Sequence, residues 1–216
     1  MCSRYFLDAD GNVIAYTFTV PVDERIRPRF NIAPTQEAPV IRAAKDGGRE
    51  VAMLRWGLVP FWAKDPKIGH KMINARGETV LEKPAFRNAF ASRRCIVPAS
   101  GFFEWTGAPG AKLPHAITLA DRPLIAMAGL WERWRDAPGV PLETYTILTT
   151  PASQFMSAIH DRMPLILETA DIDAWLSGPL DEARELVKPY AGEAMREREV
   201  NRLLNNPRND SAELLL

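Results

Sequence analysis

The sequence has little cysteine, little histidine and no long apolar run. The longest apolar run, residues 123–131, is much shorter than the roughly 20 residues that a membrane helix needs. No apolar stretch typical of a secretory signal follows Met1, and the phosphate-binding and nucleophile patterns GxxxxGK[ST], GxGxxG and GxSxG are absent. The cysteines and histidines, none at zinc-ligand spacing, are Cys2, Cys95, His70, His115 and His160. We therefore predict a cytoplasmic protein with no metal, no nucleotide cofactor and no membrane span.

An excess of charge of one sign is also missing. The 216 residues carry 27 Lys and Arg side chains and 27 Asp and Glu side chains, which excludes a general polycation. The charges are nevertheless unevenly distributed. Residues 1–115 have 17 basic and 11 acidic side chains, a net charge of +6, and residues 116–216 have a net charge of −6. Such an asymmetry indicates a local anion-binding face.

Short runs rich in Val, Ile, Leu and Thr predict a fold built mainly from strands. The predicted strands are 39–43, 51–56, 94–98 (which would bury Cys95), 115–119, 124–130 and 144–149. The predicted helices are 83–91, 153–158, 170–176 after an N-cap at Thr169, and 180–190. Because helices do not alternate with the strands, we predict an α+β fold. It would be a single compact domain over 1–216, with a mixed, mostly antiparallel β core flanked by short helices.

We also predict the form of three glycine-containing loops and of the C-terminal residues. Residues 46–48, 107–110 and 136–139 are predicted to be hairpin loops rather than domain linkers. Residues after about 210 are expected to form a loose tail.

Cys2 follows the initiator methionine, a position that gives cysteine unusual chemistry. Methionine is commonly removed before a small residue, and removal of Met1 would leave an α-amine and a thiol on neighbouring carbon atoms. Their ordinary pKa values, about 8 and about 8.5, leave both nucleophiles partly available at neutral pH. The pair can form an imine with an aldehyde and then close a thiazolidine ring. Alternatively, the thiol can attack an amide with the amine as base, or Cys2 can be an ordinary residue that leads into a strand.

Six further segments occur in a fixed order along the chain. They are RFNIAPT at 29–35, RWGLVPFW at 55–62, INARGET at 73–79, CIVPASGFFEW at 95–105, IHDRMP at 159–164 and NNPRND at 205–210. Together with Cys2, these segments resemble the SOS response-associated peptidase (SRAP) family of abasic-site processing proteins. The resemblance extends from Cys2 to about Asp210 and so covers nearly the whole chain.

The resemblance implies an activity on single-stranded DNA that contains an abasic site. In that family, the cysteine exposed by methionine removal forms a thiazolidine with C1′ of the ring-opened sugar, and the crosslink shields the site from strand cleavage. The family usually begins Met-Cys-Gly-Arg, whereas this chain has Ser3 in place of the conformationally free glycine. The implied partner is abasic single-stranded DNA, bound by a monomer without metal or cofactor. The positions that match the family's catalytic residues are Cys2, Asn74, Glu104 and His160.

Three of these residues also have purely structural interpretations. Asn74 fits a turn asparagine, or an amide that holds the sugar or the α-amine. Glu104 stands between Phe103 and Trp105, where an alternating strand would point it to solvent. A position facing a pocket would instead raise its pKa and suit it to proton transfer. His160, with an ordinary pKa of about 6.5, fits a structural role or an acid that helps to open the sugar ring.

Arginines and aromatic rings near these positions are candidate DNA contacts. Arginine binds phosphates in a bidentate, sequence-independent way, and aromatic rings stack on bases. Trp62, which follows a proline and precedes a polar segment, is the aromatic residue that we expect to be exposed for stacking. The candidate phosphate contacts are Arg4, Arg76, Arg87, Arg93, Arg94 and Arg162.

Three functional hypotheses follow. In the first, Cys2 captures abasic-site aldehydes while Glu104 shuttles protons, His160 assists ring opening or the imine steps, and Asn74 orients the reactants. In the second, the protein is an N-terminal-nucleophile peptidase or amidohydrolase in which Cys2 attacks an amide; removal of its own Met1 would be one such reaction. In the third, it is a non-covalent single-strand-binding module. The arginine and aromatic content favours DNA.

Overall fold

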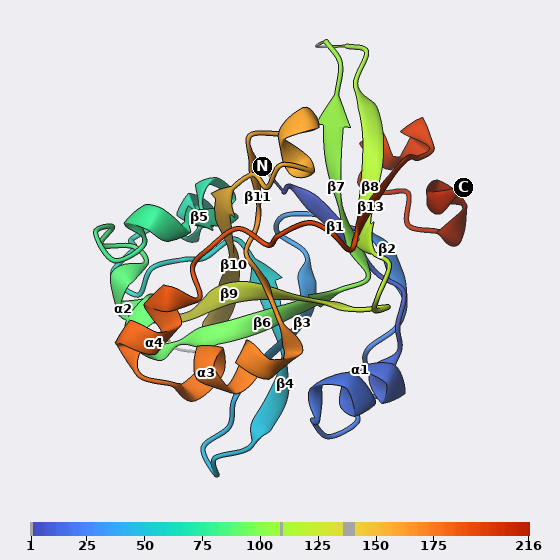
Figure 1. Cartoon of the computed structure of the whole chain (residues 1–216). Helices are drawn as coiled ribbons and strands as arrows, with labels where there is room; N and C mark the ends of the chain where they lie inside the picture. The colour runs from blue at the N-terminus through green and yellow to red at the C-terminus, as the bar shows by residue number, and fades with distance from the viewer. Residues whose placement is uncertain (1, 109, 136–140) are drawn as a thin grey trace.

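Strands dominate the fold, with short helices around them (Figure 1). The structure is a computed structural model that describes residues 2–108, 110–135 and 141–216. Its strands are β1 (Arg4–Leu7), β2 (Arg29–Ile32), β3 (Glu37–Ala43), β4 (Arg49–Trp56), β5 (Asn74–Arg76), β6 (Arg94–Ala99), β7 (Gly101–Thr106), β8 (Leu113–Leu119), β9 (Ile125–Trp134), β10 (Leu142–Pro151), β11 (Arg162–Pro164), β12 (Ile166–Leu167) and β13 (Met195–Glu199). Its α-helices are α1 (Gly11–Phe18), α2 (Arg87–Ser92), α3 (Ile172–Ser177) and α4 (Leu180–Glu185). Its 3-10 helices are η1 (Pro66–Lys71), η2 (Gly77–Thr79), η3 (Met156–Ala158), η4 (Thr169–Asp171), η5 (Arg202–Asn205) and η6 (Ala212–Leu215).

The strands form two sheets. In the first, β9 pairs with both β6 and β10, so β9, β10, β4, β3 and β6 close into a ring, to which β11, β5 and β12 are added. The second sheet has the order β13-β8-β7-β1-β2, and all of its neighbouring strands are antiparallel. In the described ranges, parallel pairing is confined to β10 with β4 and β5. The predicted α+β class with a mostly antiparallel core is confirmed.

Two hydrophobic cores lie on opposite faces of the second sheet. The main core joins that sheet to the ring, and it contains Phe102 of β7 together with Ile96 and Leu148 of the ring. The smaller core contains Phe6, Phe103, Ala116, Val200, Leu204 and Leu214. Successive side chains on a strand point to opposite faces, so Phe102 faces the main core and Phe103 the smaller one. Glu104 therefore lies on the same face as Phe102, toward the interior.

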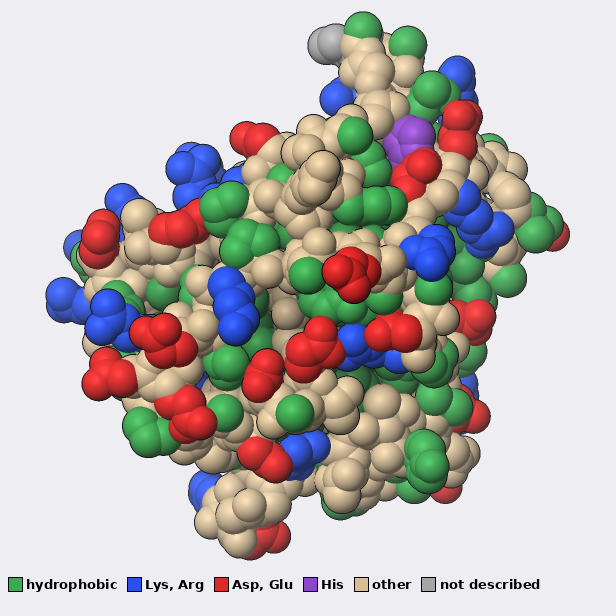
Figure 2. All heavy atoms as spheres, in the orientation of Figure 1, with side chains coloured by type: hydrophobic (Ala, Val, Ile, Leu, Met, Phe, Trp, Pro, Cys, Tyr) green, Lys and Arg blue, Asp and Glu red, His purple; other side chains and the backbone are tan. Residues whose placement is uncertain are grey.

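All six predicted strands are confirmed, and Cys95 is buried in β6 as predicted. Two of the predicted hairpin loops, at 46–48 and 107–110, join β3 to β4 and β7 to β8, although residue 109 lies outside the described residues. The third, at 136–139, lies outside the described residues altogether. Among the helices of the described chain, none is long and apolar enough to cross a membrane. The basic and acidic side chains are interspersed on the face drawn in Figure 2.

The predicted helices are wrong in their extents. The segment 83–91 becomes helical only at Arg87, and 153–158 yields only the 3-10 turn η3. Residues 170–176 divide into η4, which Thr169 begins rather than caps, and α3. The helix predicted at 180–190 ends at Glu185, and Pro189 further along disfavours helical backbone at Lys188, the residue before it. The expected loose tail is also wrong, since η6 buries Leu214 in the smaller core.

Sequence inspection missed α1, which has a clear start signal. The Asp10 side chain accepts hydrogen bonds from the backbone N–H groups of Asn12 and Val13, at 2.9 and 3.0 Å, and so caps the helix. Gly11 is required next to this cap because a Cβ atom there would lie 2.3 Å from the carbonyl oxygen of Asp23. The Asp-Gly pair was therefore a usable signal for the beginning of a helix.

Asn31 ties the C-terminal segment to β2 and is fully buried. Its Nδ2 group donates to the carbonyl oxygens of Leu204, Asn206 and Asn209, and its Oδ1 accepts from Arg4 Nη1 at 2.9 Å. The Asn31→Ala substitution leaves these groups without their partner. We expect it to lower the free energy of unfolding by about 3 kcal/mol or more, because unsatisfied buried polar groups cost about 1–3 kcal/mol each.

Urea-induced unfolding monitored by fluorescence would measure this loss. Asn12→Ala is the matched control, since Asn12 is exposed and its substitution should change stability by no more than about 0.5 kcal/mol. An Asn31→Ala variant as stable as the Asn12→Ala variant would contradict the structural role given to Asn31.

Candidate active site

Cys2 is fully buried immediately before β1. Its Sγ lies 3.6 Å from the carbonyl oxygen of Arg4, to which the thiol donates, and its own carbonyl oxygen accepts from Asn74 Nδ2 at 2.7 Å. Burial and the nearby Glu104 carboxylate both raise the pKa of the Cys2 thiol. The thiol is thus protonated at neutral pH.

Ser3, which stands where the family usually has glycine, has backbone angles outside the left-handed region. Among non-glycine residues of the described chain, only Thr19 and Thr35 lie in that region. Serine is therefore accommodated here without backbone strain.

Glu104 is a buried carboxylate in β7, with only 3% of its surface exposed. The β1–β7 pairing aligns Arg4 with Phe103, which brings the N-terminal residues beside Glu104. Burial raises the pKa of Glu104, the charge of His160 opposes this rise, and Asp161 adds to it. Of the two alternatives for Glu104, the one that points it to solvent is wrong, because β7 has both faces covered by hydrophobic cores. A carboxyl group with a raised pKa is suited to donate and accept protons near neutral pH.

His160 is located between η3 and β11, within electrostatic reach of Glu104. The backbone N–H of Arg162 donates to His160 Nδ1 at 2.9 Å, which in the neutral ring leaves the proton on Nε2. Asp161 Oδ1 lies 2.8 Å from the same nitrogen. His160 is thus held by its neighbours just before β11, on the same side as Glu104.

Two pockets adjoin Cys2. The first, called here the Glu104 pocket, has a volume of about 480 Å³ and is lined by Ser3, Arg4, Glu104, Trp105, Lys112, His160 and Asn205. The second, called the Trp62 pocket, has a volume of about 370 Å³ and is lined by Trp62, Met72, Asn74, Arg76, Thr79, Lys83, Pro84, Ala85 and Phe86. Cys2 connects them, since Asn74 of the second pocket binds its carbonyl group and Ser3 of the first follows it in the chain. The four predicted catalytic positions are thereby brought together.

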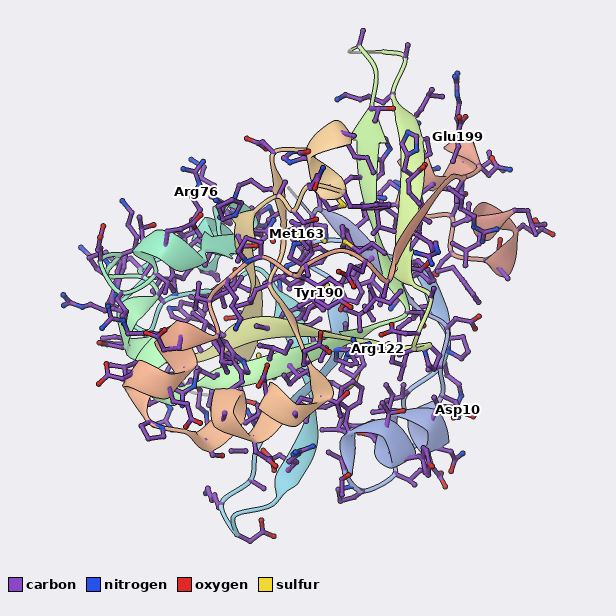
Figure 3. The ribbon with its side chains drawn as sticks, in the orientation of Figure 1. Asp10, Arg76, Arg122, Met163, Tyr190 and Glu199 are labelled. Atoms are coloured by element: carbon purple, nitrogen blue, oxygen red, sulfur yellow. The ribbon has the colours of Figure 1, made fainter. Side chains whose placement is uncertain are left out.

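The predicted DNA-contacting side chains fall into two groups. Arg76 lines the Trp62 pocket and extends outward from β5 (Figure 3), and Arg87 is exposed at the start of α2. Trp62 is 49% exposed, as expected of a stacking residue. Arg4 lines the Glu104 pocket, although its Nη1 is bonded to Asn31 and to the carbonyl oxygen of Leu204.

The other three arginines have structural partners. Arg94 is 6% exposed, and its guanidinium donates to the carbonyl oxygens of Phe90, Trp175 and Gly178. Arg162, whose side chain is 11% exposed, forms an ion pair with Glu78 and donates to Thr149. Arg93 pairs with the buried Glu132 at 2.8 Å. These contacts engage guanidinium donors of Arg94 and Arg162 inside the fold, and the phosphate-binding role of the three arginines stays a prediction.

Sequence inspection gave no role to Lys112 and Asn205, two residues that line the Glu104 pocket. Asn205 belongs to the NNPRND segment, so its place in a recurring motif was the available signal. Lys112 carried no such signal, because only the pairing of β7 with β8 brings it near Glu104.

A sequence model of the SOS response associated peptidase (SRAP) family matches residues 1–207. The chain belongs to this family. The SRAP chain is 44% identical to the abasic site processing protein YoaM of Bacillus subtilis, over 100% of its own length and 97% of that relative's. It is 35% identical to the abasic site processing protein HMCES of Gallus gallus, over 89% of its own length and 67% of that relative's.

A solved structure confirms the fold of this SRAP chain. The crystal structure of a protein from Bacteroides thetaiotaomicron superposes with a TM-score of 0.89, at 29% sequence identity. The match covers 99% of this chain and 98% of that protein.

Proposed function

We propose that this SRAP protein processes abasic sites in single-stranded DNA and, after removal of Met1, forms a covalent thiazolidine crosslink through Cys2. The observation that carries the proposal is the position of Cys2, buried between two pockets, held by Asn74 and adjacent to Glu104. Relatives that cover the whole chain and are named abasic site processing proteins support the same substrate.

The amine of Cys2 reacts first. Because burial and Glu104 keep the thiol protonated, an attack by thiolate is disfavoured, which also counts against a cysteine-peptidase mechanism. The deprotonated α-amine adds to the aldehyde carbon C1′ of the ring-opened sugar, and loss of one water molecule gives an imine. The sulfur then bonds to C1′ while the thiol proton passes to the nitrogen. The thiazolidine ring is complete with one water molecule released in total.

The neighbouring residues would move the protons and fix the geometry. Glu104, with its raised pKa, accepts a proton from the amine and returns one to the departing hydroxyl group. His160 assists opening of the sugar ring to the aldehyde. Asn74 holds the backbone of Cys2 in position through its 2.7 Å hydrogen bond.

Burial of Cys2 favours single-stranded DNA as the substrate. An abasic sugar inside a duplex must be extruded from the double helix to reach a fully buried residue, and this step costs least in a single strand. Basic side chains at both pockets, Arg4 and Lys112 at one and Arg76 and Lys83 at the other, suit the phosphates on either side of the sugar.

A denaturing gel tests the proposal. The protein, shown by mass to lack Met1, is incubated with a single-stranded oligonucleotide carrying one abasic site. A slowly migrating covalent band is expected with this DNA but not with the same sequence without the abasic site. If the protein forms no covalent band with either DNA, the proposed function is wrong.

The exposed Trp62 should contribute to DNA affinity rather than to the covalent step. We expect Trp62→Ala to weaken binding of single-stranded DNA by about 5- to 100-fold, the cost of losing one stacked base. The crosslinking rate at saturating DNA should stay within about twofold of the unmodified protein, because neither Cys2 nor Glu104 is among the residues that line the Trp62 pocket. Fluorescence anisotropy and single-turnover kinetics would measure the two effects separately.

Phe61 provides a matched control for this experiment. It is 53% exposed beside Trp62 but does not line either pocket next to Cys2. Phe61→Ala should leave DNA affinity nearly unchanged, and an equal loss in both variants would show that Trp62 has no specific stacking role.

A further inference from the structure

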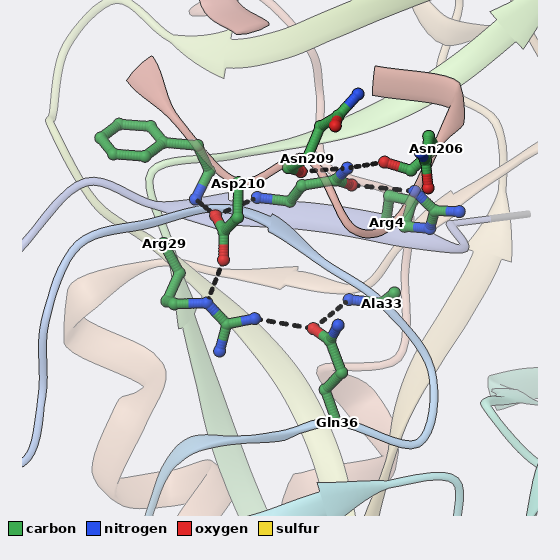
Figure 4. Close-up of polar contacts among 9 residues, drawn as sticks. Arg4, Arg29, Ala33, Gln36, Asn206, Asn209 and Asp210 are labelled. Carbon is green, nitrogen blue, oxygen red and sulfur yellow. Dashed lines mark hydrogen bonds and ion pairs between the residues drawn. The ribbon is translucent and has the colours of Figure 1, made fainter. Parts of the chain in front are cut away.

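The C-terminal arm, defined here as residues 201–210, reaches the active site from the end of the chain. Asp210 accepts from the backbone N–H groups of Phe30 and Asn31, at 2.5 and 3.1 Å, and forms an ion pair with Arg29 (Figure 4). Asn31 in turn binds carbonyl oxygens of the arm, and Arg4 Nη1 donates to the carbonyl oxygen of Leu204 at 3.2 Å. The arm is thus fixed to β1 and β2, the strands next to Cys2.

Packing holds the middle of the arm in place. Leu204 is fully buried in the smaller core, where it lies with Phe6 and Phe103 on the outer face of the second sheet. The following residue, Asn205, is exposed and lines the Glu104 pocket. Asn205 therefore forms a fixed wall of the pocket, next to an anchored leucine.

One hydrogen bond fixes how the Asn205 amide is oriented. Trp105 Nε1 donates to Asn205 Oδ1 at 2.7 Å. An indole N–H is a donor only, so the oxygen of the amide must face Trp105. The Nδ2 group, which can only donate, is the part of the amide that remains to meet a ligand.

We propose that Asn205 Nδ2 binds the phosphodiester beside the abasic sugar and so helps to select the substrate of the proposed crosslinking reaction. The pocket supports this choice, since Lys112 and Arg4 supply positive charge next to Asn205, and Ser3 adds a hydroxyl donor. A phosphate oxygen accepts hydrogen bonds from all of these groups. The inference rests on the proposed function, and it assigns Asn205 to substrate binding rather than to bond formation.

Asn205→Asp tests this role without disturbing the fold. The aspartate keeps an oxygen that accepts from Trp105 but replaces the Nδ2 donor with a second oxygen, which repels a phosphate. At subsaturating abasic DNA, we expect the crosslinking rate to fall by roughly tenfold to a hundredfold, because hydrogen bonds to charged groups are strong. The rate at saturating DNA should change much less.

Asn206→Asp is the matched control. Its Oδ1 accepts from the backbone N–H of Arg208, a bond that aspartate retains, and Asn206 does not line the Glu104 pocket. It adds the same charge to the neighbouring residue of the arm. If the crosslinking rate at subsaturating DNA falls equally in the two variants, general repulsion of DNA explains the result and the inference is wrong. An unchanged rate in Asn205→Asp would also overturn the inference.

Oligonucleotides with one uncharged methylphosphonate at either linkage flanking the abasic sugar identify the contacted group. When one of the two linkages is uncharged, we expect the crosslinking rates of Asn205→Asp and the unmodified protein at subsaturating DNA to lie within about twofold of each other. A difference that persists with both modified oligonucleotides would contradict a phosphate contact. Absence of a crosslink from the unmodified protein would instead disprove the proposed function, so the two failures are distinguishable.

Discussion

Cys2→Ala is expected to abolish the stable crosslink to abasic DNA. Once Met1 is removed, alanine still offers an α-amine, so the imine can form, but no thiol is present to close the ring. The imine then hydrolyses or undergoes β-elimination, and strand cleavage at the abasic site should increase. Borohydride, which reduces imines, should still trap a covalent product with this variant. Denaturing gels of the protein and DNA bands, run with and without borohydride, would measure both outcomes.

Cys95→Ala is the matched control for this variant. Cys95 is also fully buried, in β6, so its substitution likewise removes one buried thiol but no residue of the candidate active site. Each substitution should cost on the order of 1 kcal/mol in stability, and only Cys2→Ala should lose the crosslink. A stable crosslink in Cys2→Ala, formed without borohydride, would show that the thiol is not part of the product.

Glu104→Gln is expected to slow crosslinking by about 10²-fold or more, the usual contribution of a general acid–base residue. Glutamine preserves the size of the side chain but can neither accept nor release the proton of the amine. Single-turnover kinetics at saturating abasic DNA would measure this loss, after mass analysis has shown that both proteins have the same N-terminus. A rate within a few-fold of the unmodified protein would exclude Glu104 as the proton shuttle.

The same substitution should stabilise the fold, with a pH dependence of known sign. Burial raises the pKa of Glu104 in the folded state. Below the ordinary carboxyl pKa of about 4.3, Glu104 is protonated in both the folded and the unfolded state, so its ionisation does not lower the free energy of unfolding there. As the pH rises, the unfolded chain ionises first, and the unmodified protein loses stability until the folded-state pKa is passed. The melting temperature of Glu104→Gln should therefore exceed that of the unmodified protein by more at pH 7 than at pH 4. A constant difference would contradict the raised pKa.

Several features of the fold were predictable because their signals are local. The short β-branched runs gave the strands of the ring, and Cys95 followed from its place within one of them. The helices were less predictable because their ends depend on tertiary packing. Val187, for instance, leaves the helical course of α4 and packs against Gly77, where a Cβ atom would lie 2.4 Å from its side chain. No pattern near residue 187 indicates that contact.

The candidate site likewise has features that the sequence predicts and features that only the structure reveals. The resemblance to the SRAP family selected Cys2, Asn74, Glu104 and His160, and the structure brings them together. The environment of Glu104 was not predictable, since alternation along β7 does not reveal that both faces of its sheet are covered. The roles of the arginines were also hidden, because a sequence cannot distinguish Arg94, which binds three carbonyl groups inside the fold, from the exposed Arg76.

Mapping the site of attachment tests the central claim most directly. The covalent product of the Met1-free protein and abasic single-stranded DNA is isolated without borohydride, digested with a protease and a nuclease, and sequenced by mass spectrometry. We predict one modified peptide, which begins at Cys2 and carries the sugar fragment with the loss of one water molecule. Attachment to a lysine side chain, or to a peptide that still contains Met1, would contradict the account.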